Sequence, residues 1–417
     1  MSLRGRCVIR ARPDEQALPR REMALVGGVV LLVSIGAFHR VPLLPAMGDE
    51  LSMSPGLLGL ITTVFAVGRL CTDIPAGRLA DRVPPLRSLG LAGVILAVGS
   101  VALASAPSAA WVLASAFVLG IASALANTTG MTFFSTAAPA ARRGSSMAVF
   151  SAALLGGQAL GPTVGGAIGG AAGWRVAIVS AAAIGLVVAA VGAASARFAT
   201  QPRAGGGGHG HGSRGAGADP TPRVQRWVLY SVSFSLMFML GSMPQTLVPI
   251  IGDERFSLSA AHIGLALGVG GLCRFVGAMV GGRLADRVSR KASLVPGMLL
   301  CSGGVALLAL DAGATGWLAA IVLLSLGSYG VTVSATMLAD HARGSGVGRR
   351  LGTYRFLGDV GLIAGPALSA VLYEYVGQAA AVAVVAVLLL VVAVVCAALL
   401  QETRWLDEPR PSVEVPR

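Results

Sequence analysis

The heptapeptide GRLADRV occurs twice in this chain, at Gly77–Val83 and again at Gly282–Val288. The two copies lie 205 residues apart (282 minus 77). The same offset aligns further positions: Gly59 with Gly264, Arg69 with Arg274, Ser52 with Ser257 and Ser54 with Ser259. Chance does not give so many matches at one spacing. The sequence therefore predicts two halves that arose by duplication, each with one copy of the heptapeptide.

The composition around these copies is that of a membrane protein. Of the 417 residues, 54% are hydrophobic and only 12% are charged, whereas an ordinary globular domain carries about 25% charged residues. The apolar residues form long runs, such as Leu294–Leu310 and Ala379–Leu400. Runs of roughly 18 or more apolar residues are typical of spanning helices and are too long for barrel strands. Because helices satisfy their own backbone polar groups in a bilayer, we expect an all-α integral membrane protein.

Twelve transmembrane helices are expected, six on each side of one long polar break. Their approximate bounds are 23–46, 56–77, 88–106, 110–135, 147–169, 174–196, 227–251, 260–281, 293–310, 317–339, 351–372 and 378–400. The break contains GGGGHGHGSRGAGADPTP, a composition typical of flexible linkers. The expected organisation is two pseudo-symmetric six-helix bundles, divided into a basic tail (1–22), a first half (23–196), a linker (197–226), a second half (227–400) and a final tail (401–417).

The distribution of basic residues predicts the orientation. The formal charge is +13, from 32 Lys and Arg against 19 Asp and Glu. With the N-terminus in the cytoplasm, only Arg175 and Arg255 fall on the outer side, four arginines fall within spans, and all the other basic residues face the cytoplasm. This is the positive-inside pattern. The excess of basic residues is thus explained by insertion in a lipid bilayer and not by binding to nucleic acid. Both termini are expected in the cytoplasm. The protein is expected to be monomeric. The Ala-, Gly- and Arg-rich composition hints at a bacterial source and a bacterial cytoplasmic membrane.

Two six-helix halves on a parallel repeat are an arrangement found in secondary transporters. Here the sequence resembles the major facilitator superfamily, whose loop between helices 2 and 3 reads G-x-L-A-D-R-x-G-R-[RK]. The matching residues are Gly77, Leu79, Asp81, Arg82 and Arg87 in the first copy, and Gly282, Leu284, Asp286, Arg287, Arg290 and Lys291 in the second. The first copy departs from the pattern at Pro84 and Pro85. The resemblance implies a transporter fold over essentially the whole chain.

A physical role is expected for each part of this loop signature. Gly77 and Gly282 would let the chain pack tightly and turn at the membrane surface. Asp81 and Asp286 would accept hydrogen bonds from a neighbouring helix N-terminus or pair with the loop arginines. Such a cluster could latch the two halves in one conformation. Because only the second copy keeps its trailing basic residues, the latch is expected to be asymmetric.

The fifth predicted helix carries a glycine pattern common in drug and metabolite exporters of the superfamily. Its residues are Gly157, Gly161, Pro162, Gly165 and Gly166, and the eleventh helix carries a weaker copy at Gly361, Gly365 and Pro366. The glycines allow close helix–helix approach, and Pro162 frees a backbone carbonyl and permits a bend. Packing alone and gating explain these residues equally well.

Ionisable groups inside the predicted spans are costly and are expected to face a partner or a cavity. Arg69 and Asp73 stand four residues apart on the second helix, and Arg355 and Asp359 repeat this spacing on the eleventh. The superfamily resemblance places these two helices side by side, with Arg274 at the matching place on the eighth. We hypothesise an inter-half polar network near the cytoplasmic gate, with Asp359 as the proton-coupling group and Asp73 as the second candidate. The alternative is two static intrahelical pairs.

Further polar residues lie in predicted spans. His39 and Arg40 on the first helix could line the cavity, but we favour snorkelling to the outer interface. Cavity lining or interhelical hydrogen bonding is expected for Asn127, Gln158 and Gln245. No metal site is expected, since the five cysteines show no ligand spacing and His209 and His211 alone are too few.

The expected function is secondary active transport of a small organic molecule by alternating access. The expected direction is export, driven by a proton gradient. The chain has no GxxxxGK[ST] motif for ATP and no nucleophile–base pair, so no cofactor and no enzymatic activity are expected. The largely apolar cavity predicts lipophilic or weakly polar substrates. The alternatives are an uptake symporter or facilitator of the same fold, and a non-transporting membrane sensor or scaffold.

Overall fold

The computed structural model describes residues 20–137, 142–195, 222–310, 312–341 and 347–403, and this part of the chain is helical with no β-strand. The first half holds α1 (Arg20–Phe38), the 3-10 turn η1 (Val41–Leu43), α2 (Leu44–Leu51), α3 (Pro55–Arg82), α4 (Pro85–Ala104), α5 (Ala109–Thr136), α6 (Arg143–Ala172) and α7 (Trp174–Ser195). The second holds α8 (Arg223–Ser242), the π-helical turn η4 (Met243–Leu247), α9 (Val248–Phe256), α10 (Ala260–Arg287), α11 (Arg290–Leu307), α12 (Gly313–Gly327), α13 (Gly330–His341), α14 (Val347–Tyr375) and α15 (Gln378–Leu399).

The duplication is visible in the element boundaries. Helices α3 and α10 are both 28 residues long, and they begin and end at positions separated by the sequence offset. Each follows a serine in the left-handed conformation, Ser52 or Ser257, with φ of 50° in both. Each also begins after an extended N-cap serine, Ser54 or Ser259. The prediction of two related halves in an all-helical membrane fold is confirmed.

Among the described residues, eleven helical segments are long and apolar enough to cross a membrane. The first is 31 residues long and runs through α1, η1 and α2, and the seventh is 34 residues long and runs through α8, η4 and α9. Prolines interrupt the regular helix in both, because proline lacks the N–H that the helix needs. The remaining predicted span corresponds to α11, which begins with the charged pair Arg290 and Lys291 and has 18 residues in all.

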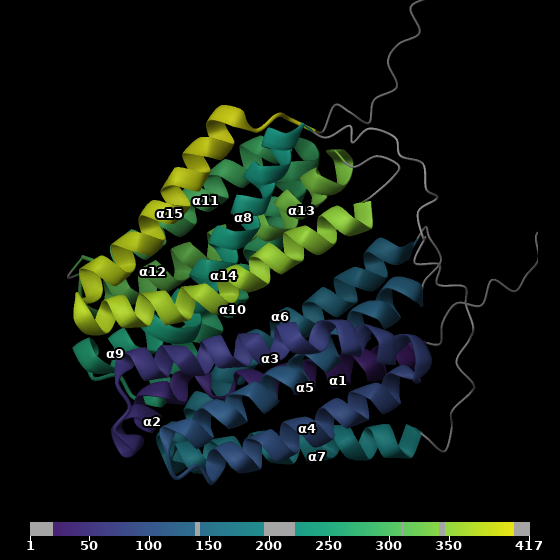
Figure 1. Ribbon diagram of the computed structural model, residues 1–417, viewed down its shortest axis with the longest axis vertical. Helices are drawn as coiled ribbons and strands as arrows, with labels where there is room; N and C mark the ends of the chain where they lie inside the picture. The colour runs from purple at the N-terminus through teal and green to yellow at the C-terminus, as the bar shows by residue number, and fades with distance from the viewer. Residues whose placement is uncertain (1–19, 138–141, 196–221, 311, 342–346, 404–417) are drawn as a thin grey trace, which may run out of the picture.

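The two halves meet along two helix pairs that the repeat relates to each other. Helix α3 packs against α14, and α10 packs against α6 (Figure 1). Small residues bring the backbones together. A Cβ atom on Gly59 would meet Ala370 and the carbonyl of Pro366, and one on Gly264 would meet the carbonyl of Pro162. Glycine at these crossings is therefore a requirement of packing.

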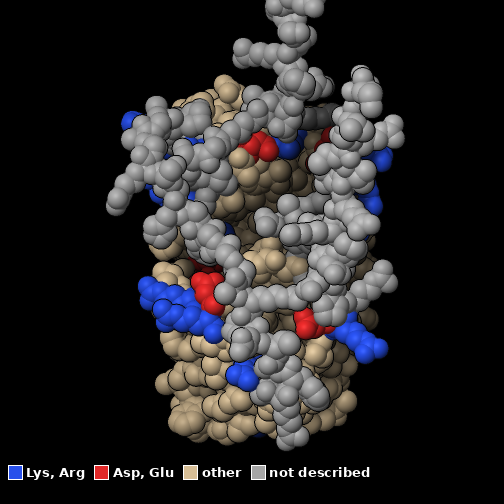
Figure 2. Space-filling view, turned by 90° about the vertical axis from the view of Figure 1, so that its right-hand side faces the viewer, with Lys and Arg blue, Asp and Glu red and all other residues tan. Residues whose placement is uncertain are grey.

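The interface between the halves is tight at the end of the molecule formed by α2 and α9, which we call the closed end. There the N–H of Gly56 donates to Glu374 Oε2 (2.8 Å), and Thr63 Oγ1 donates to the Ile363 carbonyl (2.9 Å). From this end α3 and α14 diverge from left to right in Figure 1. The opposite end, where α3 and α10 end at the exposed Arg82 and Arg287, is called the basic face. Figure 2 shows this face, with Lys and Arg grouped on both halves and the surface hollowed between them.

Candidate functional site

A cavity lies between the two halves and contains roughly 590 Å³ of space, part of it open to solvent. The first half contributes residues from α1, η1 and α6, and the second contributes residues from α8, η4, α10 and α12. Most of the lining is apolar, as a pocket for an organic molecule requires. The lining residues are Phe38, Val41, Leu155, Gln158, Pro162, Leu240, Pro244, Gln245, Leu267, Gly270, Gly271, Arg274, Ile321 and Ser325.

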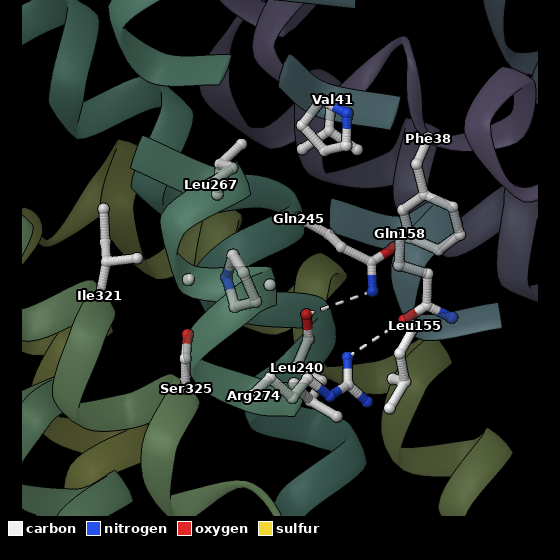
Figure 3. A pocket seen from close by; sticks show the side chains of 14 residues that line it. Phe38, Val41, Leu155, Gln158, Leu240, Gln245, Leu267, Arg274, Ile321 and Ser325 are labelled. Carbon is white, nitrogen blue, oxygen red and sulfur yellow. Dashed lines mark hydrogen bonds between the residues drawn. The ribbon is translucent and has the colours of Figure 1, made fainter. Parts of the chain in front are cut away.

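The break in the seventh span shapes one wall of this cavity. Pro244 has no N–H, so the helix cannot give the Leu240 carbonyl its usual donor. The side chain of Gln245 supplies one instead, with Nε2 at 3.2 Å from that oxygen (Figure 3). The backbone carbonyl of Gln245 in turn accepts from Thr62 Oγ1 of α3, over 3.1 Å. The π-helical turn thus holds the cavity wall and links it to the other half.

Arg274 is the one charged residue among those that line the cavity. Its Nη1 donates to Gln158 Oε1 over 3.2 Å, so α10 of one half contacts α6 of the other at this point (Figure 3). Sequence reasoning expected Arg274 beside the membrane charges of α3 because it aligns with Arg69. The structure places it in the cavity instead. The two positions differ because α10 packs on α6, whereas its repeat partner α3 packs on α14.

The other residues expected in the cavity divide into two groups. Gln158 and Gln245 line it, but His39, Arg40 and Asn127 do not. His39 and Arg40 are buried, at 0% and 1% exposure, so the expected snorkelling is wrong. The first span was expected to end at residue 46 but continues to Leu51, so both residues lie farther from its end than expected.

In the part of the chain that the structure describes, the buried Arg40 contacts an aromatic ring and not an acidic side chain. Its guanidinium carbon lies 4.1 Å from the ring centroid of Phe65, a cation–π distance. None of its three side-chain nitrogens has a hydrogen-bond partner among the described residues. The neighbouring His39 donates through Nδ1 to the Ile35 carbonyl, over 2.8 Å.

The four charges hypothesised as an inter-half network do come together on α3 and α14. Asp359 lies within electrostatic range of Arg69, Asp73 and Arg355. In the described part of the chain, however, no ion pair within 4.0 Å joins any two of them, either across the interface or along one helix. Asp73 Oδ1 accepts from Thr128 Oγ1 (3.2 Å), and Arg355 Nη1 lies 3.2 Å from the sulfur of Met131 on α5.

The model of the Major Facilitator Superfamily matches two overlapping stretches of this sequence, residues 26–272 and 230–417. The chain belongs to the Major Facilitator Superfamily. The class G tetracycline resistance protein of Vibrio anguillarum is 28% identical to it over 359 residues, 83% of this chain and 88% of that protein. The chloramphenicol resistance protein of Streptomyces lividans is 27% identical over 296 residues, 68% of this chain and 71% of that protein.

A solved structure shares the fold. It is that of a bacterial homologue of the human lysosomal transporter Spinster, in an inward-facing and occupied conformation. The TM-score is 0.76 at 15% identity, over 92% of this chain and 97% of the other. The chain is therefore a multi-pass membrane transporter of small molecules and not an enzyme.

The superfamily loop signature adopts a different local structure from the one expected. Gly77 and Gly282 lie inside helices, with open space where a Cβ would be, so neither makes a turn or a tight contact. Asp81 and Asp286 are exposed in the last turns of α3 and α10. The carboxylate that caps a helix here is that of Glu402, whose oxygens accept from the backbone N–H groups of Arg290 and Lys291 at the start of α11 (both 3.1 Å).

This cap makes the two copies of the signature unequal. Glu402 also bonds the hydroxyl of Ser289, and Arg290 forms an ion pair with Asp340 at the end of α13. The residues that trail the second copy thus connect α10, α11, α13 and the segment after α15. The sequence could not assign the cap to Glu402, because that residue lies more than a hundred positions away.

The glycines of the superfamily's helix 5 pattern lie at helix crossings. Cβ atoms at Gly157 and Gly161 would meet the backbone of α1, and one at Gly165 would meet the backbone of His39 just after α1. A Cβ atom at Gly166 would meet Ala260 and Gly264 of α10. Helix α14 repeats the arrangement, with Gly361 and Gly365 against α8. The pattern therefore positions α6 between its own half and the other one.

Proposed function

We propose that this transporter exports a small organic molecule from the cytoplasm by alternating access, in exchange for protons. The observation that carries the proposal is a cavity lined by both halves and sealed by inter-half contacts at one end. A site at the boundary of two pseudo-symmetric halves is the binding position of such transporters. The named relatives support the direction, because a membrane transporter gives drug resistance by removing the drug from the cell.

The basic face is assigned to the cytoplasm of a bacterial cell, with both termini on that side. Arginines gather there by the positive-inside rule, and the closed end then faces outward. With this orientation, we propose that the conformation is inward-open and that the substrate enters between the two halves from the cytoplasm.

Release to the outside requires the closed end to separate. The contacts to be broken are Gly56–Glu374 and Thr63–Ile363, together with the bonds from Thr62 to η4. The threonine bonds join neutral groups and contribute about 0.5–1.5 kcal/mol each. The bond to the exposed carboxylate of Glu374 contributes about 1 kcal/mol. A few such bonds give a barrier that a ligand or a proton can overcome.

Asp359 is proposed as the coupling group. It is a carboxylate within the membrane, within electrostatic range of the opposite half, and it has no direct ion pair among the described residues. Protonation would remove its attraction to Arg69 and Arg355 and so change the balance between the two states. The protein is proposed to act as a monomer, since both helix pairs that carry the movement belong to one chain.

The test is a growth screen of an expressing host that lacks its own drug pumps, followed by flux into inverted membrane vesicles. We expect protection against at least one compound of the panel, and vesicle uptake of that compound that depends on the pH gradient. The control is Ser325→Trp, which fills the cavity and should abolish both effects at an equal amount of protein in the membrane. Greater sensitivity with faster cellular uptake would favour import, and no flux in either direction would favour a sensor or scaffold.

A further inference from the structure

No acidic group among the described residues balances the charge of Arg274. No carboxylate among the described residues lies within ion-pair distance of its guanidinium, and the titratable group in electrostatic range of it is the thiol of Cys301. Its Nη1 donates a hydrogen bond to the neutral amide of Gln158. A guanidinium has five N–H donors in a planar fork, so most of its donors are left for another partner.

The rest of the membrane interior does not supply the missing charge. The spans predicted from the sequence contain four arginines at Arg40, Arg69, Arg274 and Arg355, against two aspartates at Asp73 and Asp359. Both aspartates lie on the α3–α14 side, where they act on each other and on Arg69 and Arg355. The α6–α10 side, which holds the cavity, therefore carries an excess positive charge.

The surroundings of Arg274 are otherwise apolar. Phe38 and Leu155 of the first half and Leu240, Leu267 and Ile321 of the second line the same space (Figure 3). An isolated charge next to apolar side chains is costly unless a counter-charge reaches it. The guanidinium fork matches the two oxygens of a carboxylate, or two oxygens of a sulfonate, better than any neutral group.

We infer that the cavity binds an amphipathic organic anion. Its acidic group pairs with Arg274, and its apolar body packs among Phe38, Leu155, Leu240, Leu267 and Ile321. This inference rests on the proposed function, in that it takes the cavity as the substrate site. It differs from the lipophilic or weakly polar substrate expected from the apolar composition, because it takes the charge of Arg274 into account.

Binding of a matched pair of probes tests the inference on the full-length protein in nanodiscs. The probes are 2-naphthylacetate and its primary amide, which share the apolar body and differ in charge, with 2-naphthalenesulfonate as a second anion. We expect calorimetry to show at least tenfold tighter binding of both anions than of the amide. In Arg274→Gln the preference should disappear, and in Arg274→Lys it should be reduced but retained, because the charge remains and the fork is lost.

The matched control is Arg223→Gln, the same substitution at an exposed arginine that starts α8, outside the cavity lining. It should leave the anion preference unchanged. Equal binding of anion and amide by the wild-type protein overturns the inference, and this result does not depend on the folding of any variant. A preference that survives in Arg274→Gln, or no binding of the anions at all, overturns it as well. If the growth screen finds a substrate, the export proposal stands whichever of these results is obtained. If the screen finds none, the export proposal is contradicted independently of the probe binding.

Discussion

The N–H of Gly56, in the first turn of α3, donates a hydrogen bond of 2.8 Å to the carboxylate of Glu374, near the end of α14. The donor is one of the N–H groups that a helix start leaves without an intrahelical partner. A carboxylate at this position is favoured by the helix dipole. A Cβ atom at position 56 would collide with Glu374, so glycine permits the approach. The bond joins the two halves at the closed end.

We expect Glu374→Ala to weaken the closed end, because it removes the carboxylate that accepts the bond from Gly56. A hydrogen bond to a charged group contributes roughly 1.5–3 kcal/mol when shielded, and the exposure of Glu374 reduces this to about 1 kcal/mol. A loss of that size shifts a two-state equilibrium about fivefold. Spin labels at Asp49 and His262, both exposed near the closed end, should therefore show a larger long-distance population.

The control for this experiment is Glu254→Ala. Glu254 lies at the same end, but it accepts from Tyr373 Oη (2.6 Å) within the second half only. The label distances should stay as in the wild type. The same shift in both variants would mean that surface charge, and not the Gly56 bond, controls closure.

Proton coupling is expected to depend on Asp359. The substitution Asp359→Asn imitates the protonated carboxyl and fixes its interaction with Arg69 and Arg355. Flux driven by a pH gradient should fall at least tenfold, and the remaining flux should lose its pH dependence. Exchange of labelled for unlabelled substrate, which needs no proton, should persist. The measurement is flux in proteoliposomes with and without an imposed gradient.

Asp73→Asn is the comparison for Asp359→Asn. Asp73 accepts a hydrogen bond from Thr128 within the first half, and an asparagine can still accept it. We expect a slower rate with the pH dependence kept. Undiminished pH dependence in Asp359→Asn, or its loss in Asp73→Asn alone, would assign coupling to the other aspartate.

The fold was predictable from the sequence because it depends on local composition and on a repeat. Apolar runs of helical length predict spans, and one offset relates α3 to α10 down to their terminal residues. The interruptions η1 and η4 were harder to predict. A proline in a span indicates a break, but only the tertiary structure shows that Gln245 then satisfies the Leu240 carbonyl.

The site was predictable only in part, because it depends on which helices meet. Gln158 and Gln245 could be suggested as polar residues in spans. Arg274 was assigned to the wrong group, since the repeat aligns it with Arg69 but the two helices pack on different partners. The role expected for Asp286 belongs to Glu402, and no local pattern relates those two positions.

The crossing of α6 and α10 is expected to tolerate no added methyl group. In Gly264→Ala the new Cβ would press on the Pro162 carbonyl and on Gly166. Overpacking of this kind costs about 1–3 kcal/mol, so the melting temperature and the flux should both fall. Gly303→Ala is the matched control, because Gly303 lies in α11 with nothing within 4 Å of its added Cβ. That variant should be unchanged or more stable by up to about 1 kcal/mol, from helix propensity. Equal effects of the two substitutions would mean that the crossing is not tight.

Replacement of the buried Arg40 is expected to raise stability, whereas Gly264→Ala is expected to lower it. The guanidinium of Arg40 is 1% exposed, and it contacts the ring of Phe65. This contact stabilises the fold by about 0.5–2 kcal/mol. The free-energy cost of removing the charge from water is larger. Methionine has a similar length and no charge to desolvate. Arg40→Met should therefore unfold at the same or a higher temperature, with stability raised by up to about 2 kcal/mol.

Phe65→Leu keeps the charge of Arg40 and removes the ring that it contacts, so it should lower stability by roughly 2–4 kcal/mol. Thermal unfolding in detergent, followed by the reactivity of the buried Cys301 and Cys396, compares the two. A loss of stability in Arg40→Met as large as in Phe65→Leu would show that the charge itself holds the first half together.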